Sequence, residues 1–178
     1  MPEIEVPLEQ ASEDTMHHAK HSGERWIEGV ALSSAIVAVL AALTAMLAGH
    51  HSDEAMIDQI KSSDQWSFYQ AKSIKANLAG TKVDIMIALG KEAAEHDKDK
   101  IQEYKKEMEE IQEKAKEFEA GSERHLKHHI MYARGVTMFQ IAIAISAISA
   151  LTRRRRFWLV GVAFALGGIC FLGLGLNL

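Results

Sequence analysis

Three uncharged apolar runs divide the chain, at residues 29–49, 135–151 and 157–176. A membrane-spanning helix needs about 20 apolar residues to cross roughly 30 Å of hydrocarbon. The first and third runs reach that length, and the second reaches it if Tyr132 and Ala133 are included. None of the runs alternates apolar and polar residues as the strands of a membrane β-barrel do. The pattern therefore predicts transmembrane helices at residues 26–49, 131–152 and 157–178.

Residues 50–130, between the first two runs, are strongly charged and contain no proline. Apolar and small residues recur there at alternating spacings of three and four, which is typical of a helix-packing seam. The first seam has three polar interruptions and comprises Ile57, Ile60, Asp64, Ser67, Ala71, Ile74, Leu78, Thr81, Ile85 and Ala88. The second comprises Ile101, Tyr104, Met108, Ile111, Ala115 and Phe118. We expect two helices that face each other through these seams, with a helix-breaking charged patch at 96–99 and a turn near 90–99.

Together these patterns predict an all-α membrane protein with a long antiparallel coiled-coil hairpin between its first and second transmembrane helices. The overall composition hides this, because 25% of the residues are charged and the mean hydropathy is −0.07. Residues 1–25 form an acidic N-terminal segment, whose order the sequence leaves open. The first apolar run is too long, and begins too far into the chain, for a cleaved signal peptide. An uncleaved membrane anchor is therefore expected.

The link at 153–156 consists of four consecutive arginines, Arg153, Arg154, Arg155 and Arg156. Short loops rich in Lys and Arg remain in the cytoplasm. We therefore expect a cytoplasmic N-terminus, with residues 50–130 and the C-terminus on the periplasmic or extracytoplasmic side. Arg124, Lys127 and Arg134 precede the second apolar run and favour the opposite orientation, although long loops cross the membrane largely regardless of their charge.

Residues 63–75 read Ser-Asp-Gln-Trp-Ser-Phe-Tyr-Gln-Ala-Lys-Ser-Ile-Lys, after one apolar run and before an acidic helix with two terminal apolar runs. In this arrangement the chain resembles the bacterial family catalogued as domain of unknown function 4337. The resemblance covers the chain from about residue 24 onward, and its most specific part is Trp-x-x-Tyr-Gln-Ala-Lys-Ser-Ile-Lys. It implies a multi-pass protein of the bacterial inner membrane and supplies no established activity.

Within that stretch, Trp66, Tyr69, Lys72 and Lys75 lie near one flank of the predicted helix. Two interpretations remain open. The aromatic rings pack against the returning arm or a neighbouring copy while the lysines face water, or the four side chains form a recognition patch for a partner. Aromatic and cationic residues are common at protein interfaces.

Histidines are the candidate metal ligands. His50 and His51 end the first apolar helix, and His125, His128 and His129 precede the second. These residues would meet at the base of the hairpin, where they could bind zinc or another divalent metal. The alternative is that they solvate the helix ends. His17, His18 and His21 form a second cluster near the N-terminus, to which the same two interpretations apply.

Other patterns exclude several function classes. The apolar runs carry no charge in their middle, which argues against a pump or coupled transporter. No phosphate-binding loop, nucleophile elbow, HExxH or CxxC occurs, so we expect no enzyme. The excess of acidic over basic residues argues against nucleic-acid binding. We expect a scaffold in the lipid bilayer that forms a homo-oligomer or binds another envelope protein. The alternatives are a metal-binding or metal-sensing protein and an oligomeric channel or transporter accessory subunit.

Overall fold

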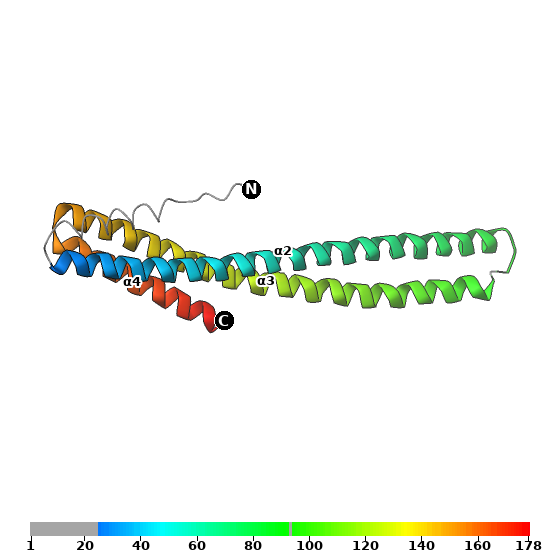
Figure 1. The fold of residues 1–178 in the computed structure, drawn as a ribbon. Coiled ribbons are helices and arrows are strands. Elements are labelled where there is room, and N and C mark those ends of the chain that lie inside the picture. The colour runs from blue at the N-terminus through cyan, green and yellow to red at the C-terminus, as the bar shows by residue number, and fades with distance from the viewer. Residues whose placement is uncertain (1–24, 93) are drawn as a thin grey trace. The chain divides into compact units, whose positions relative to one another are not determined.

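The structure is a computed structural model that describes residues 25–92 and 94–178. Three helices make up nearly all of this part of the chain (Figure 1). Helix α2 is Arg25–Ala88, α3 is Glu95–Thr152 and α4 is Arg155–Leu176. The N-terminal histidine cluster and the acidic segment up to residue 24 lie outside the described residues. The all-α prediction is confirmed, with α2 packing on α3 and α3 packing on α4.

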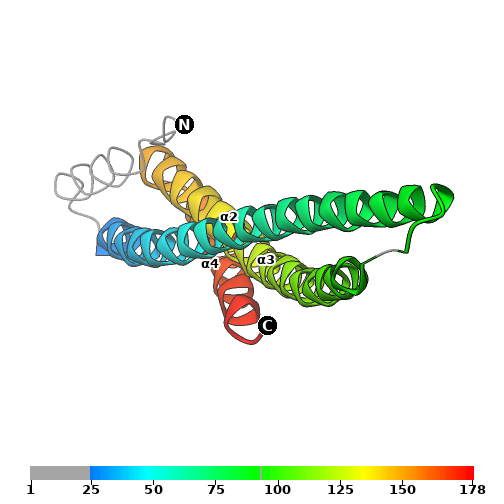
Figure 2. The same ribbon diagram turned by 90° about the vertical axis from the view of Figure 1, so that its right-hand side faces the viewer.

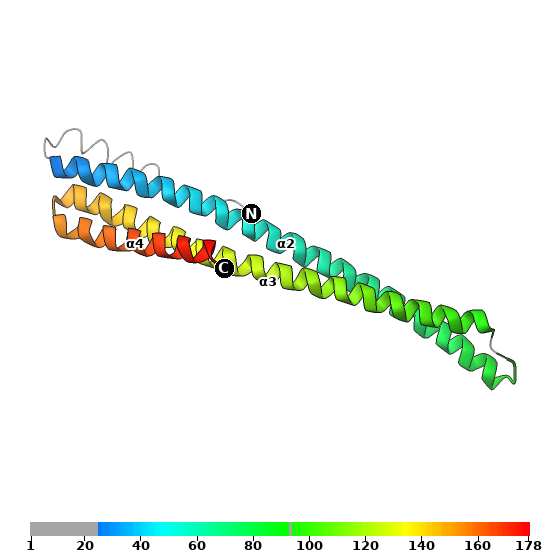
Figure 3. The same ribbon diagram turned by 90° about the horizontal axis from the view of Figure 1, so that it is seen from below.

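The chain divides into two compact units. The first, called here the span unit, comprises residues 25–52 and 126–178 of the described chain, and the second, the hairpin unit, is Asp53–His125. Each of the three helices is long and apolar enough to cross a membrane. The three apolar segments predicted from the sequence are the α2, α3 and α4 segments of the span unit, and they lie beside one another (Figure 3).

Helix α4 packs on α3 in the span unit through a row of glycines. Gly161, Gly168 and Gly175 are buried at intervals of seven residues. A Cβ atom at Gly168 would lie 2.5 Å from the Phe139 ring, and one at Gly175 would lie 2.6 Å from the Tyr132 ring. The aromatic rings therefore occupy the space that side chains at these positions would need. Close helix contact through small residues is a common mode of packing between membrane helices.

The tight link between α3 and α4 carries the four arginines. Arg153 adopts φ +54°, a left-handed conformation that side-chain-bearing residues rarely adopt. The Ser149 hydroxyl donates a hydrogen bond to the Arg154 carbonyl oxygen at 3.2 Å, which fixes the end of α3. The Arg155 guanidinium lies over the Trp26 ring, 5.4 Å from its centre. All four arginines are exposed, and Arg155 and Arg156 lie in the first turn of α4.

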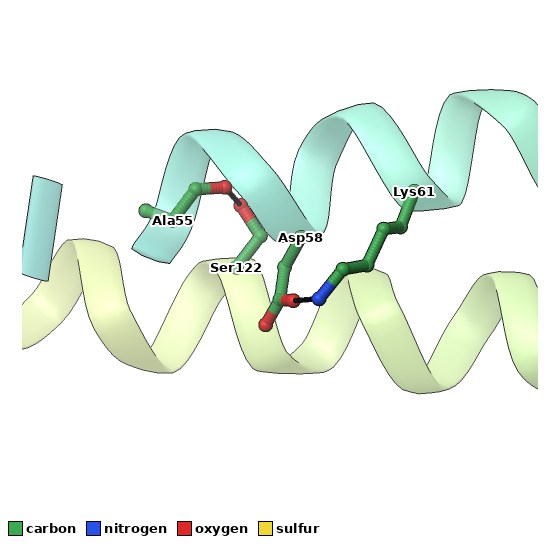
Figure 4. A network of polar contacts seen from close by, with 4 residues as sticks. All are labelled: Ala55, Asp58, Lys61 and Ser122. Carbon is green, nitrogen blue, oxygen red and sulfur yellow. Dashed lines mark hydrogen bonds and ion pairs between the residues drawn. The ribbon is translucent and has the colours of Figure 1, made fainter. Parts of the chain in front are cut away.

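The two arms of the hairpin unit run antiparallel (Figure 1). Ser62 Oγ donates to the Ala115 carbonyl oxygen at 3.1 Å, and Ser122 Oγ donates to the Ala55 carbonyl oxygen at 2.8 Å. Figure 4 shows the second of these bonds beside the Asp58–Lys61 ion pair. Residue 55 of α2 meets residue 122 of α3, and residue 62 meets residue 115. The numbers rise along α2 as they fall along α3, as an antiparallel pair requires.

Residues 89–92 and 94 lie outside the helices, between the ends of the two arms (Figure 2). Gly90, at φ +71°, ends α2 in a Schellman motif, in which the Lys91 amide donates to the Met86 carbonyl and the Gly90 amide to the Ile87 carbonyl. Our expectation that residues 96–99 break the helix is wrong, because α3 begins at Glu95 and includes them. Glu95 and Asp97 occupy its first turn, where carboxylates interact favourably with the helix dipole.

The second predicted seam is correct and the first is wrong. The six seam positions of α3 are buried or half-buried. All ten seam positions of α2, from Ile57 to Ala88, are exposed. The face of α2 that contacts α3 is instead made of positions seven residues apart that are small or only partly covered. They are Ala55, Ser62, Tyr69, Ala76 and Val83. The ten exposed positions are called the outer stripe below.

Candidate functional site

A cluster of histidine and tyrosine rings lies in the span unit, where α2, α3 and α4 meet. The His51 ring stacks on the His128 ring, with centroids 4.6 Å apart and an interplanar angle of 11°. It also stacks on the Tyr132 ring at 5.5 Å. The His50 ring lies 5.5 Å from that of His51. Residues from all three helices therefore take part, because the Tyr132 hydroxyl also donates to the Gly175 carbonyl oxygen of α4 at 2.9 Å.

Hydrogen bonds define the chemical state of two of these histidines. His128 Nδ1 lies 3.0 Å from the Gly175 carbonyl oxygen, and His129 Nδ1 lies 2.8 Å from the Ala48 carbonyl oxygen. A carbonyl oxygen only accepts, so each Nδ1 carries a proton and donates. The Gly175 oxygen is one of the last carbonyls of α4, which lack partners within their own helix. His128 and Tyr132 thus cap α4 from the side of α3.

The contacts of these histidines do not test the hypothesis that they bind a metal. The structure brings His50, His51, His128 and His129 into the span unit, whereas His125 belongs to the hairpin unit. Within residues 25–92 and 94–178, no group of three or more His, Cys, Asp or Glu side chains could hold a metal ion. The contacts that the structure does show tie helices together. Metal binding by these five histidines stays a prediction.

The Trp66 motif contacts the returning arm of the hairpin. Trp66 Nε1 donates to Glu119 Oε1 at 2.8 Å, and its ring meets that of Tyr69 edge to face at 5.5 Å. Lys72 forms an ion pair with Glu107 and lies over the Tyr104 ring. Lys75 is exposed. Trp66, Tyr69 and Lys75 are placed as in the first interpretation, whereas Lys72 contacts α3 instead of facing water. The partner-recognition role stays a prediction.

Two charged groups of the hairpin have shifted pKa values. The hydrogen bond from Lys72 to Glu107 raises the pKa of the Lys72 ammonium, with a smaller opposing effect of desolvation. The hydrogen bond from Lys82 lowers the pKa of the Asp97 carboxyl, again against desolvation. Lys82 Nζ lies 2.8 Å from both carboxylate oxygens of Asp97. These pairs link α2 to α3 and stabilise the charged form of each group.

A groove of about 590 Å³ lies between the arms of the hairpin unit. Leu78, Ile85, Met86 and Tyr104 supply most of its apolar lining, and three lysines also line it. The lysines are Lys75, Lys82 and Lys100. The groove therefore joins part of the outer stripe to the side of α3, and it offers an apolar surface with a basic border.

Sequence reasoning missed two features. The indole of Trp158 on α4 donates to the Ser33 hydroxyl of α2 at 3.2 Å, a contact between residues that no spacing rule relates. Sequence reasoning also missed that the outer stripe is exposed. The alternation of threes and fours correctly identified a row of mainly apolar positions, but such a row looks the same in sequence whether its own chain or another molecule covers it.

The comparisons with known proteins give a family and no activity. The family model described as "Domain of unknown function (DUF4337)" matches residues 26–178, which is most of the chain. No curated protein and no solved structure matches the chain. The resemblance expected from residues 63–75 is thus confirmed by a match that extends through all three helices. This chain belongs to the DUF4337 family.

Proposed function

We propose that this protein is a membrane-anchored scaffold of the bacterial inner membrane, which crosses the bilayer three times and assembles with copies of itself through its helical hairpin. The family match carries no activity, so the support comes from the distribution of side chains. One observation supports it above the others: the span unit exposes many large apolar side chains and buries hydroxyls and glycines within its apolar core.

The interior of the span unit contains hydroxyls and glycines. Ser34, Thr44, Ser146 and Ser149 are 0–6% exposed. On the outside, Leu32, Val39, Met46 and Leu166 are 60–66% exposed, together with many other large apolar side chains. A water-soluble helical bundle would bury most of these exposed large apolar side chains, because their burial is its main source of stability. Lipid removes that driving force and favours close packing of small residues.

The orientation follows from the arginine link. Arg153, Arg154, Arg155 and Arg156 are exposed at the tight connection between α3 and α4. Two arginines in the first turn of α4 oppose the helix dipole, so local helix stability does not favour them there. Retention of a short basic loop in the cytoplasm gives them a role. With three crossings, the hairpin unit and the C-terminus lie on the extracytoplasmic side.

The hairpin supports an assembly role through its surfaces. Its described residues present a long exposed apolar stripe on α2 and a charged α3, with eleven acidic and seven basic residues between 95 and 125. Exposed apolar surface of this extent in a soluble region marks an interaction site. Assembly in the membrane would cover it.

Two measurements on the full-length chain test the proposal. Membranes that contain it are washed with alkaline carbonate, which releases peripheral proteins, and the purified chain is then weighed by native mass spectrometry in lipid nanodiscs. We expect the chain to remain in the washed membranes and to appear as two or more copies per particle. Release by the wash would refute membrane insertion, and a single copy would refute self-assembly.

A further inference from the structure

The outer stripe of α2 is a mainly apolar row of positions, interrupted by Asp64, Ser67 and Thr81, that its own chain leaves exposed. Ile60, Ile74, Leu78 and Ile85 are 54–70% exposed, and Ile57 is 41% exposed. The arm of α3 contacts the other side of α2, at the positions that recur every seven residues from Ala55 to Val83. At about 100° of rotation per residue, that series lies roughly opposite the centre of the stripe. The hairpin fold itself therefore leaves about half or more of most of these side chains uncovered.

We propose that the outer stripe of one copy packs against the same stripe of a second copy, in parallel and in register. This inference rests on the proposed function and names the surface through which assembly occurs. The occupant is a second copy of α2, and three observations support such a pair.

The first observation is the spacing. The stripe alternates threes and fours from Ile57 to Ala88 without a break, which is more than four heptads. Three to four sustained heptads are the usual sign of a coiled coil. The period matches a rod-like helical partner that follows α2 along its whole arm. A flat lipid surface imposes no requirement for a narrow seam with a 3.5-residue period.

The second observation is the placement of charge beside the stripe. Lys61, Lys75 and Lys82 each come directly after a stripe residue and share one heptad position, which lies along one edge of the stripe. The other edge carries mainly uncharged residues, among them Met56, Ser63, Gln70 and Asn77. A parallel pair brings opposite edges together and so places each lysine beside an uncharged residue. An antiparallel pair would bring lysine edges together and cost energy through repulsion. Copies that insert with the same topology can only pair in parallel.

The third observation concerns the polar members of the stripe. The Ser67 hydroxyl donates to the Ser63 carbonyl at 3.0 Å, and the Thr81 hydroxyl donates to the Asn77 carbonyl at 2.9 Å. Their protons are already bonded within α2, so covering these residues leaves no donor unsatisfied. Asp64 is the exception, because a parallel pair in register brings two Asp64 carboxylates together. That contact weakens the dimer and provides a test.

Disulfide crosslinking in native membranes tests the pairing surface. Cys170→Ser removes the single native cysteine, and Ile74→Cys, Leu78→Cys or Ile85→Cys then places a thiol on the stripe. Ile87→Cys is the matched control, because Ile87 is 60% exposed on the same arm but outside the stripe. We expect mild oxidation to convert most of the stripe variants to dimers and at least five-fold less of the control. Equal crosslinking of all four variants, or none on the stripe, would overturn the inference.

Substitutions test the energetics of the same surface. We expect Leu78→Asp to reduce the dimer fraction at least ten-fold, Ile87→Asp to leave it unchanged, and Asp64→Asn to increase it. Circular dichroism confirms that each variant keeps its helices, which the exposure of these side chains favours. If nanodisc particles contain several copies but the stripe variants neither crosslink nor dissociate, this inference fails and the proposed function stands. Particles with one copy refute both.

Discussion

At the scale of single residues, the glycines of α4 show how the span unit is held together. Gly168 and Gly175 accept the rings of Phe139 and Tyr132 from α3. Gly173, on the same helix, has no atom within 4 Å of where a Cβ would lie. The same substitution therefore has opposite consequences at positions a few residues apart.

We expect Gly168→Ala and Gly175→Ala each to destabilise the span unit by about 1–3 kcal/mol, because the new methyl group overpacks an aromatic ring. Gly173→Ala is the matched control and should be neutral or stabilise by up to about 1 kcal/mol, as alanine favours a helix. Thermal unfolding in detergent, followed by circular dichroism, measures the difference. Equal effects at all three positions would contradict the packing described.

Trp66 separates the two interpretations of the family motif. Its indole bonds to Glu119 and its ring contacts Tyr69. We therefore expect Trp66→Ala to lower the stability of the hairpin by about 1–3 kcal/mol through loss of a charged hydrogen bond and of ring packing. Copy number in nanodiscs should not change. Lost assembly with an unchanged unfolding curve would instead indicate a recognition patch.

At the scale of elements, ion pairs between the arms hold the end of the hairpin near the loop. Lys82 and Asp97 pair across it, and the pKa of the Asp97 carboxyl falls below its ordinary value of 3.8. A group whose pKa is lowered by folding stabilises the fold above its unfolded-state pKa. That contribution is lost as pH falls through the folded-state pKa, which here lies below 3.8.

We expect carboxyl-carbon NMR of the full chain to give Asp97 a titration midpoint below 3.8, the ordinary value for an aspartate. Lys82→Gln removes the hydrogen-bond donor that lowers this pKa, so the midpoint should return towards the ordinary value. Lys75→Gln is the control, because Lys75 is not paired with Asp97. An Asp97 midpoint that is the same with and without Lys82 would show that the pair does not persist in solution.

The elements also show how far sequence reasoning extends. Length and hydropathy were sufficient for the three apolar helices, because the cost of an uncovered backbone in lipid leaves few alternatives. Periodicity identified the correct inner face of α3, which contains large residues such as Met108 and Ile111. It failed for α2, whose inner face is built on Ala55, Ser62 and Ala76. Small residues let two helices approach closely but contribute little to an apolar pattern. The stronger apolar pattern of α2 was that of the exposed outer stripe.

The histidine cluster was only partly predictable. Sequence placed His51 and His128 at helix ends beside apolar runs, and the structure stacks their rings. It could not show that Nδ1 of His128 bonds to a carbonyl 47 residues away. Such a bond depends on how α4 returns along α3. The sequence does not show which backbone carbonyl oxygens accept hydrogen bonds from the histidine rings.

At the scale of the whole molecule, we propose three membrane crossings and one extracytoplasmic hairpin. The family match covers residues 26–178 and therefore includes both units. In this proposal the arginine link and the hairpin loop are separated by one crossing through α3. They must lie on opposite sides of the membrane if the span unit is embedded in lipid.

Cysteine labelling in intact cells tests this most directly. In a Cys170→Ser background, Lys91→Cys reports on the hairpin loop and Arg154→Cys on the link between α3 and α4. We expect a membrane-impermeant maleimide added outside to label Lys91→Cys in cells whose outer membrane is permeabilised, and to label Arg154→Cys only after the inner membrane is broken. Labelling of both positions from the same side would contradict the three-crossing arrangement, and the reverse pattern would contradict the orientation.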